Sequence, residues 1–360
     1  MVKKNLKVLI IGAGPTGLTA ALELARKGVK PEIVDAKKRP SPLSRAPGIL
    51  PKSIKNLKAS GAGDKIFKAA LKFNKVRIHY GKKNIIDLDF SKNFPSKDLP
   101  VILPQDKTES IMAGVLREKG VRVKYNTKVI DIKTSSQEAT ATFANGKSKK
   151  YDWIIGSDGV NSITRKKLGI KYVGYNLREV WSIADVDLLG KNNPDRFSAW
   201  IIDGVKKDIF VMVWLGPNRA RLVSSTPDSL KAMPIKLNIK TVRRAASFKI
   251  PIKQAETYVK GRVLLAGDAA HSHSPVGGRG MNLGIDDAVA AVQAILKGEV
   301  DQYNRERIKI GAKIIQDTEI IRKSLVSKNP FIVASIKLIF FLISNFDIFQ
   351  RWLIKKITKL

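Results

Sequence analysis

The sequence predicts an α/β fold: a Rossmann-like domain, an inserted antiparallel β-sheet domain and a C-terminal helical segment. Three observations predict it. A glycine-rich turn follows a short apolar run at the start of the chain. Residues 172–250 are β-patterned and show little helical periodicity. A strand and helix pattern from Arg262 to Leu296 then returns the chain to the first domain.

The composition is that of a folded protein. The 360 residues are 44% hydrophobic, so we expect two or three domains with a sizeable core. The absence of cysteine excludes disulfide scaffolds, cysteine-bound zinc, iron–sulfur clusters and thiolate catalysis. Three histidines without a His-rich helix predict no metal site. The chain enters the apolar stretch from Leu6 to Ile11 without a cleavage site, which predicts a cytoplasmic protein without a signal peptide.

The first element is a strand, from Val8 to Ile11, followed by the turn GAGPTG and a helix that ends at Gly28. A second strand ends at Asp35, eighteen residues after Gly17. This spacing is typical of a dinucleotide-binding βαβ unit. In such a unit the three glycines permit the tight turn, the approach of a pyrophosphate and close helix packing, while the acid binds a ribose. The residues concerned are Gly12, Gly14, Pro15, Thr16, Gly17 and Asp35.

The following elements alternate in type. Residues 76–90 suit a hairpin, and Thr108 to Lys119 suits a helix before a strand from Val121 to Tyr125. Residues 151–156 suit a buried strand that rejoins the first sheet. Gly284 to Leu296 suits a helix.

Two further segments specify the dinucleotide. Residues 152–165, DWIIGSDGVNSITR, resemble the Asp-Gly motif of single-component flavoprotein monooxygenases, and residues 261–282, GRVLLAGDAAHSHSPVGGRGMN, resemble their Gly-Asp motif. With the first turn, the chain resembles the FAD-dependent aromatic hydroxylases of the p-hydroxybenzoate and phenol hydroxylase type. The resemblance implies an FAD-binding domain at residues 1–75, 101–171 and 251–328, a substrate domain at 76–100 and 172–250, and a C-terminal helix at 329–360.

The resemblance also implies cofactor contacts beyond the first turn. It places Arg45 and Gln105 along the flavin chain, Asp158 between flavin and nicotinamide, and Arg165 near NADPH. A solvated surface cation is the alternative for Arg165. Asp268 is expected to hold the ribityl hydroxyls, and the following helix to direct N–H groups at the flavin pyrimidine. The residues expected here are Gly267, Asp268, Pro275, Gly278, Gly280, Met281 and Asn282.

The activity that the resemblance implies is hydroxylation of a phenolic or other aromatic substrate. FAD is reduced by NAD(P)H, reacts with O₂, and transfers one oxygen through a flavin C4a-hydroperoxide. Catalytic roles are assigned to Arg279, as a cation for the flavin anion, and to His273 near the flavin face. A solvated surface cation is the alternative for Arg279. His271 is expected to be structural. Inward residues of the β-domain, among them Asp185, Trp181, Trp200, Trp214 and Arg221, line either the substrate cavity or the core.

Two rival functions stay open. A flavin-dependent reductase of isoprenoid lipids on the same fold would use the same cofactor without oxygen. A nucleic-acid-binding protein is suggested only by the charge, since 66 Lys and Arg stand against 31 Asp and Glu, a formal net charge of +35. The basic residues are spread through the chain without a nucleic-acid-binding motif, so we expect no specific nucleic acid partner. The sequence leaves the oligomeric state open.

The most apolar stretch runs from Pro330 to Phe346 and precedes Arg351, Lys355, Lys356 and Lys359. A helix over residues 331–346 would span about 24 Å, less than the roughly 30 Å of a bilayer core. The two interpretations left are a helix packed on the FAD domain and peripheral attachment to a membrane, which would suit a lipophilic substrate.

Overall fold

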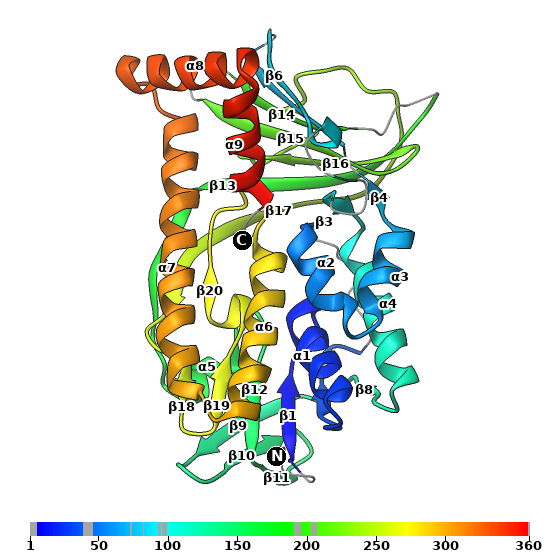
Figure 1. Cartoon of the computed structure of the whole chain (residues 1–360), viewed down its shortest axis with the longest axis vertical. Helices are drawn as coiled ribbons and strands as arrows, with labels where there is room; N and C mark the ends of the chain where they lie inside the picture. The colour runs from blue at the N-terminus through cyan, green and yellow to red at the C-terminus, as the bar shows by residue number, and fades with distance from the viewer. Residues whose placement is uncertain are drawn as a thin grey trace.

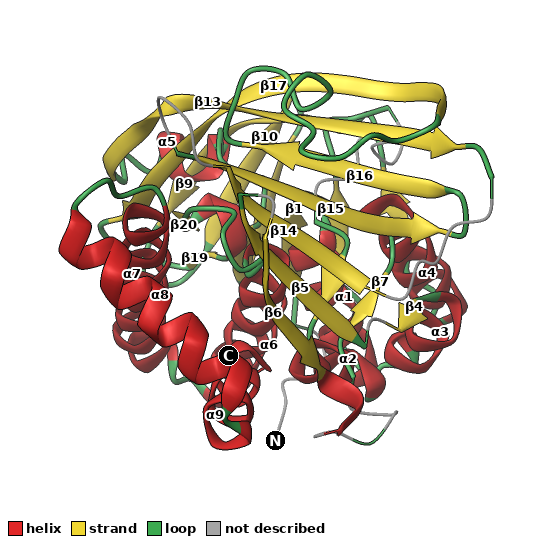
Figure 2. Cartoon of the chain, turned by 90° about the horizontal axis from the view of Figure 1, so that it is seen from above, coloured by secondary structure: helices red, strands yellow, loops and turns green. Residues whose placement is uncertain are grey.

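The computed structural model describes residues 6–38, 46–72, 74–81, 83–92, 95, 99–190, 196–202 and 207–358. It confirms the α/β class. A six-stranded sheet flanked by helices forms one half of the molecule, and an eight-stranded sheet lies across its end (Figure 1). Seen from above, the eight-stranded sheet lies over part of the other half, and helices are visible on both sides of it (Figure 2).

The six-stranded sheet is parallel apart from one edge. Neighbouring strands follow one another in the order β18 (Val259–Lys260), β19 (Val263–Leu265), β12 (Trp153–Gly156), β1 (Val8–Ile11), β2 (Glu32–Val34) and β8 (Val123–Lys124). Only β18 runs antiparallel to its neighbour. The central strands are apolar and buried throughout, as expected for a parallel sheet covered on both faces.

Helices cover this sheet and bury its side chains in one core. They are α1 (Pro15–Arg26), α2 (Pro51–Lys58), α3 (Ala62–Ala69), α4 (Gln105–Glu118), α5 (Ile163–Lys167), α6 (Gly280–Lys297) and α7 (Val300–Leu325). Two three-stranded sheets flank it: β9 (Val129–Thr134), β10 (Ala139–Phe143) and β11 (Ser148–Tyr151), and β3 (Gly48–Ile49), β4 (Leu71–Lys72) and β7 (Val101–Ile102).

The eight-stranded sheet combines segments that are distant in sequence. Its order is β20 (His271–Ser272), β17 (Ile239–Ala255), β13 (Tyr172–Leu188), β16 (Arg219–Ser224), β15 (Asp208–Gly216), β14 (Arg196–Ile202), β5 (Lys75–Tyr80) and β6 (Lys83–Asp89). The hairpin β5–β6 joins through a parallel pairing with β14. Strand β17 pairs with β13 from Ala255 to Ile239, so the expected domain boundary at residue 250 falls within one continuous strand.

The two faces of this sheet have different neighbours. Trp200, Phe210 and Trp214 belong to a cluster that packs under Leu230 and Met233 of the segment after β16. Trp181 belongs to a cluster on the other face, which Val276 of the loop before α6 joins. The structure therefore assigns Trp200 and Trp214 to core packing on the face away from that loop.

Three predicted element boundaries are wrong. Helix α4 begins at Gln105 because Pro104 serves as its N-cap, and the Thr108 hydroxyl donates to the Pro104 carbonyl at 3.3 Å instead of capping. Helix α6 begins at Gly280, four residues before the predicted start. The strand predicted from Val121 to Tyr125 is reduced to Val123–Lys124.

The C-terminal segment also differs from the prediction of one helix. It forms α8 (Pro330–Asn345) and α9 (Asp347–Thr358), separated at Phe346, whose backbone is extended. Phe340, Ile343 and Ile354 pack with Val76 and Leu88 of the hairpin β5–β6. The helices therefore pack on the edge of the eight-stranded sheet, and α8 also packs against Leu325 at the end of α7.

Candidate functional site

The three sequence motifs meet at one edge of the parallel sheet. Gly12 follows β1, Asp35 follows β2, Asp158 follows β12 and Asp268 follows β19. These four strands are neighbours and parallel, so their carboxyl ends open at the same edge. In open α/β sheets ligands bind at this edge.

The glycine turn is shaped by close packing on one side and by open space on the other. Gly12 has a φ of +103°, and a Cβ there would lie 2.4 Å from the Ser157 carbonyl oxygen. A Cβ on Gly17 would lie 1.9 Å from the Gly12 carbonyl oxygen. A Cβ on Gly14 would meet no heavy atom within 4 Å. With Pro15 at the first position of α1, this open space at the helix N-terminus fits a pyrophosphate.

Asp35 fixes the turn from the neighbouring strand. Its carboxylate accepts hydrogen bonds from the backbone N–H of Ala13 at 2.9 Å and of Lys37 at 2.8 Å. A carboxylate has about four acceptor positions, so capacity remains for ribose hydroxyls. Asp35 is therefore placed for the role that its spacing predicts.

Thr16 joins the glycine turn to the Gly-Asp motif. A Cβ on Gly267 would lie 2.5 Å from the Thr16 Oγ1 atom, and one on Gly284 would lie 2.3 Å from it. The Thr16 side chain therefore fills the space between these two glycines. The contact holds α1, the turn after β19 and α6 in one arrangement.

Asp158 and Arg165 both make contacts within the chain. The Asp158 carboxylate accepts from the Thr164 N–H at 2.9 Å and from the Ser162 hydroxyl at 2.5 Å, at the start of α5. Arg165 is only 4% exposed. Its guanidinium donates to the carbonyl oxygens of Ala269 and Val160 at 2.7 and 2.8 Å and lies 3.7 Å from the Tyr172 ring centroid. The alternative of a solvated cation is wrong, and burial lowers the Arg165 pKa.

The turn after β19 presents Asp268 outward. Gly267 begins a single 3₁₀ turn with a φ of +62°, and Gly267 and Ala269 are buried while Asp268 is exposed. The Tyr172 hydroxyl donates to the Asp268 carbonyl at 3.2 Å. The side chain of Asp268 is thus presented at the ligand edge of the sheet, where it fits ribityl hydroxyls.

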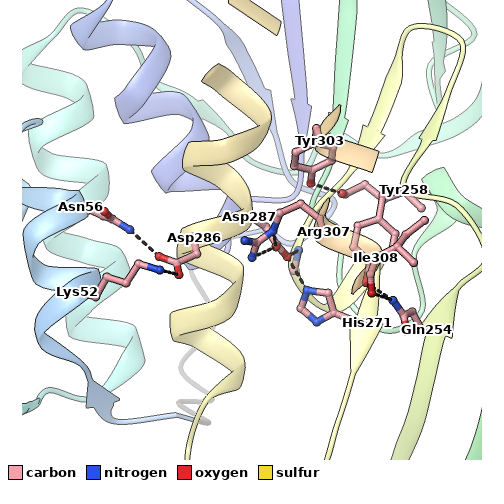
Figure 3. Close-up of polar contacts among 12 residues, drawn as sticks. Lys52, Asn56, Gln254, Tyr258, His271, Asp286, Asp287, Tyr303, Arg307 and Ile308 are labelled. Carbon is pink, nitrogen blue, oxygen red and sulfur yellow. Dashed lines mark hydrogen bonds and ion pairs between the residues drawn. The ribbon is translucent and has the colours of Figure 1, made fainter. Parts of the chain in front are cut away.

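Sequence reasoning missed the group that supports this turn, Asp287 on α6. The buried Asp287 carboxylate accepts from the Gly267 N–H at 2.9 Å and lies 2.5 Å from His271 Nε2 (Figure 3). Arg307 Nε of α7 donates to its other oxygen at 2.6 Å. Burial alone would raise the Asp287 pKa, but His271, Arg307 and the donated hydrogen bonds hold it below its usual value.

This network gives His271 a structural role, because its side chain is 1% exposed and its Nε2 atom contacts the Asp287 carboxylate. The neighbouring Tyr303 hydroxyl donates to the carbonyl of Leu265 at 2.7 Å (Figure 3). Two adjacent acids, Asp286 and Asp287, on a helix with few other charges were the available signal. Their opposite directions, Asp286 toward Lys52 and Asp287 toward Arg307, depend on the tertiary packing.

The loop from Pro275 to Gly280 is anchored by Asn282. The Asn282 amide donates to the carbonyls of Gly48 and Gly278 at 3.1 and 3.2 Å, and its oxygen accepts from the Leu50 N–H at 2.8 Å. The Gly278 N–H donates to the Pro275 carbonyl at 3.0 Å. The side chain of Asn282 is therefore structural. The first N–H groups of α6, at Gly280 and Met281, remain at the helix N-terminus, where they favour an anion.

His273 and Arg279 lie beside this helix start. His273 Nδ1 is 2.9 Å from the Ser274 carbonyl, so that carbonyl accepts its proton, while Nε2 is buried and lacks a hydrogen-bond partner among the described residues. A Cβ on Gly280 would lie 3.8 Å from Nε2. Burial lowers the His273 pKa to about 4, so the ring is neutral at neutral pH. Arg279 is partly buried, which lowers its pKa.

Gln105 is the first residue of α4 and lies beside Ala46. Its amide oxygen accepts from the Ala46 N–H at 3.3 Å, and its nitrogen donates to Glu109 at 2.8 Å. Burial raises the Glu109 pKa, although the Gln105 hydrogen bond opposes this. Arg45, the predicted partner of Gln105, lies outside the described residues.

Comparisons with known proteins identify the family. The family model described as "FAD binding domain" matches residues 5–318. The chain belongs to this family. It is 26% identical over 346 residues to 6-methylpretetramide 4-monooxygenase of Streptomyces rimosus, covering 87% of this chain and 61% of that protein. It is 26% identical to pentachlorophenol 4-monooxygenase of Sphingobium chlorophenolicum, covering 92% and 67%. The present chain therefore spans about two thirds of the length of these two curated relatives.

Solved structures agree on the fold. The crystal structure of p-nitrophenol 4-monooxygenase from Pseudomonas putida superposes with a TM-score of 0.84 at 22% identity, covering 99% of both chains. The predicted resemblance to the FAD-dependent aromatic monooxygenases and the prediction of FAD as cofactor are confirmed. The open space at Gly14 and the outward carboxylate of Asp268 fit the two ends of this cofactor.

Proposed function

We propose that this chain is a monooxygenase that hydroxylates a phenolic or other aromatic substrate, with NAD(P)H and O₂ as co-substrates. One observation carries the proposal. The three motifs converge at the carboxyl edge of the parallel sheet, and Val276 in the loop before α6 packs in the same apolar cluster as Trp181 of the eight-stranded sheet. The names of the relatives, which include pentachlorophenol 4-monooxygenase, support an aromatic substrate.

We assign the cofactor contacts as follows. Gly12 to Gly17 receive the pyrophosphate, Asp35 the adenosine ribose and Asp268 the ribityl chain. The set also includes Arg45 and Gln105. Two further members act through the backbone: Asp158 accepts a hydrogen bond at the start of α5, and Arg165 donates to the Ala269 carbonyl in the turn after β19. FAD, once reduced by NAD(P)H, supplies the activation of O₂.

The chain itself controls charge and proton position at the reacting end. The N-terminus of α6 and the Arg279 cation give a positive potential that favours an anionic partner. His273 is neutral, and its Nε2 atom, which has no hydrogen-bond partner in the described part of the chain, can accept a proton or hydrogen bond beside Gly280. These two features support the catalytic roles that we assign to Arg279 and His273.

The substrate side is the face of the eight-stranded sheet that carries Trp181. Asp185 and Arg221 are cross-strand partners on this face, joined by hydrogen bonds of 2.7 and 2.8 Å. Both are nearly fully buried, and Arg219 also lies 3.5 Å from the Asp185 carboxylate, so this face combines the apolar cluster around Trp181 with a charged group. Such a surface suits a flat aromatic ring with a polar substituent.

The test is oxidation of NADH and of NADPH by the purified protein, with a panel of phenols, under ¹⁸O₂. We expect slow oxidation alone, faster oxidation with a substrate, and one ¹⁸O atom in the product. Asp268→Ala is expected to release FAD, whereas Asp64→Ala, on an exposed side chain of α3, is the matched control and retains it.

Two results would contradict the proposal. A protein that neither holds nor takes up FAD would remove the cofactor assignment. Reduction of a substrate double bond under strict anaerobiosis, without oxygen incorporation in air, would replace hydroxylation by the reductase alternative.

A further inference from the structure

Helix α8 is apolar on nearly every side but is buried on only one. It has 16 residues, of which Phe340 and Ile343 are buried, and Lys337 is its only charged residue. It lies at the periphery of the molecule beside the edge strand β6 (Figures 1 and 2). Most side chains of this apolar helix are therefore exposed.

The outward face of α8 carries three large apolar side chains. Phe331, Leu338 and Phe341 are 81%, 58% and 57% exposed. Their spacing of seven and three residues places them on one side of the helix, away from Phe340 and Ile343. Beside them, α7 and α8 form a groove of about 490 Å³ that is lined mainly by apolar side chains.

Helix α9, which packs against α8, carries further exposed apolar side chains. Ile348, Phe349 and Trp352 are 73%, 40% and 54% exposed on α9, while Ile354 is buried against the sheet. We call Phe331, Leu338, Phe341, Ile348, Phe349 and Trp352 the α8–α9 surface. An exposed apolar region of this kind marks a docking site for a protein or a membrane.

The charge around the α8–α9 surface decides between these occupants. Residues 320–360 contain eight Lys and Arg but only one acid, Asp347. Lys323, Lys328 and Arg351 are exposed beside the apolar side chains. Lys337 lies 5.5 Å from the Tyr80 ring centroid, so its cation is directed at the sheet edge. A second copy of this strongly basic chain would bring like charges together, whereas an anionic bilayer complements them.

We propose that the α8–α9 surface docks this protein onto an anionic lipid bilayer, with its apolar side chains inserted at the headgroup boundary. Among the described residues, no single helix is long and apolar enough to cross a membrane. The pair α7 and α8 passes such a test only when joined, and it is bent by 104°. Aromatic side chains flanked by cations are typical of helices that lie in the membrane interface.

The experiment is cosedimentation of the FAD-loaded full chain with vesicles of phosphatidylcholine alone or mixed with phosphatidylglycerol. We expect binding to the mixed vesicles only. Phe331→Ser/Leu338→Ser/Phe341→Ser should weaken it at least about tenfold, because three apolar side chains no longer leave water. Lys323→Glu/Arg351→Glu should weaken it by a similar factor, because each cation near an anionic surface contributes to binding.

The matched control is Val173→Ser/Val242→Ser/Phe248→Ser, which changes three exposed apolar residues of β13 and β17 and should leave binding unchanged. Retained FAD absorbance checks folding, and Phe331→Ser alone, the most exposed position, serves if the triple variant fails to fold. Equal binding of the α8 variant and the control overturns the proposal. A full chain that binds neither kind of vesicle also overturns it. A dimer that the triple variant dissociates would then assign the surface to a second copy of the chain.

Discussion

The buried carboxylate of Asp287 supports the turn after β19, although Asp287 lies outside the sequence motif that contains this turn. Its Oδ2 atom accepts from the Gly267 N–H and faces His271 Nε2, while its Oδ1 atom accepts from Arg307 Nε and neutralises that buried cation. Its neighbour Asp286 faces the opposite way and pairs with Lys52, whose side chain is 46% exposed. The two adjacent acids therefore provide a matched pair that differs mainly in environment.

We predict that Asp287→Asn destabilises the protein by about 3–5 kcal/mol, because Arg307 is left as an uncompensated buried charge. Asp286→Asn should cost only about 1 kcal/mol, because Lys52 reaches water. Urea unfolding gives both values, and the flavin absorbance retained after gel filtration reports the turn at Gly267. Equal costs for the two variants would show that Asp287 has no special structural role.

At the scale of elements, the contact of Thr16 with Gly284 fixes how closely α1 approaches α6. Gly284→Ala would place a Cβ 2.3 Å from Thr16 Oγ1. Thr16 is β-branched and cannot easily rotate this atom away, so we expect a cost of about 1–3 kcal/mol and weaker FAD retention. In Thr16→Ala/Gly284→Ala the clashing atom is absent, and much of the stability should return.

Gly114→Ala on α4 is the control, because a Cβ there meets nothing within 4 Å. It should be neutral or stabilising by up to about 1 kcal/mol, as expected for Gly to Ala in a helix. The measurement is a double-mutant cycle by urea unfolding. A Gly284→Ala variant as stable as Gly114→Ala would contradict the packing argument.

The same elements show what the sequence can predict. The strands β1, β2, β12 and β19 are recognisable from continuous apolar runs that end at glycine or aspartate. Each motif is recognised from the spacing of neighbouring residues. The parallel order of the four strands then brings the motifs together at one sheet edge. The role of Asp287 depends on α7, and residues on both sides of the break at Phe346 pack against β5 and β6. Neither contact leaves a periodic signal in the sequence.

At the scale of the whole molecule, the dominant property is the charge of +35. Ion pairs such as Lys65 with Glu118 and Lys150 with Glu138 lie on the surface with both side chains well exposed. Exposed pairs of this kind contribute about 0–1 kcal/mol each. Repulsion among the excess cations acts over the entire surface and destabilises the compact state.

We therefore predict that the unfolding temperature of the FAD-saturated protein rises when NaCl is added up to physiological ionic strength. Salt at this level screens charges beyond about 8–10 Å, which weakens the summed repulsion more than the short ion pairs. Lys65→Gln/Glu118→Gln removes one pair without changing the net charge, so its unfolding temperature should rise by the same amount. Differential scanning calorimetry measures both proteins. A fall in unfolding temperature with NaCl would mean that the exposed pairs, and not the net charge, dominate the electrostatic free energy of folding.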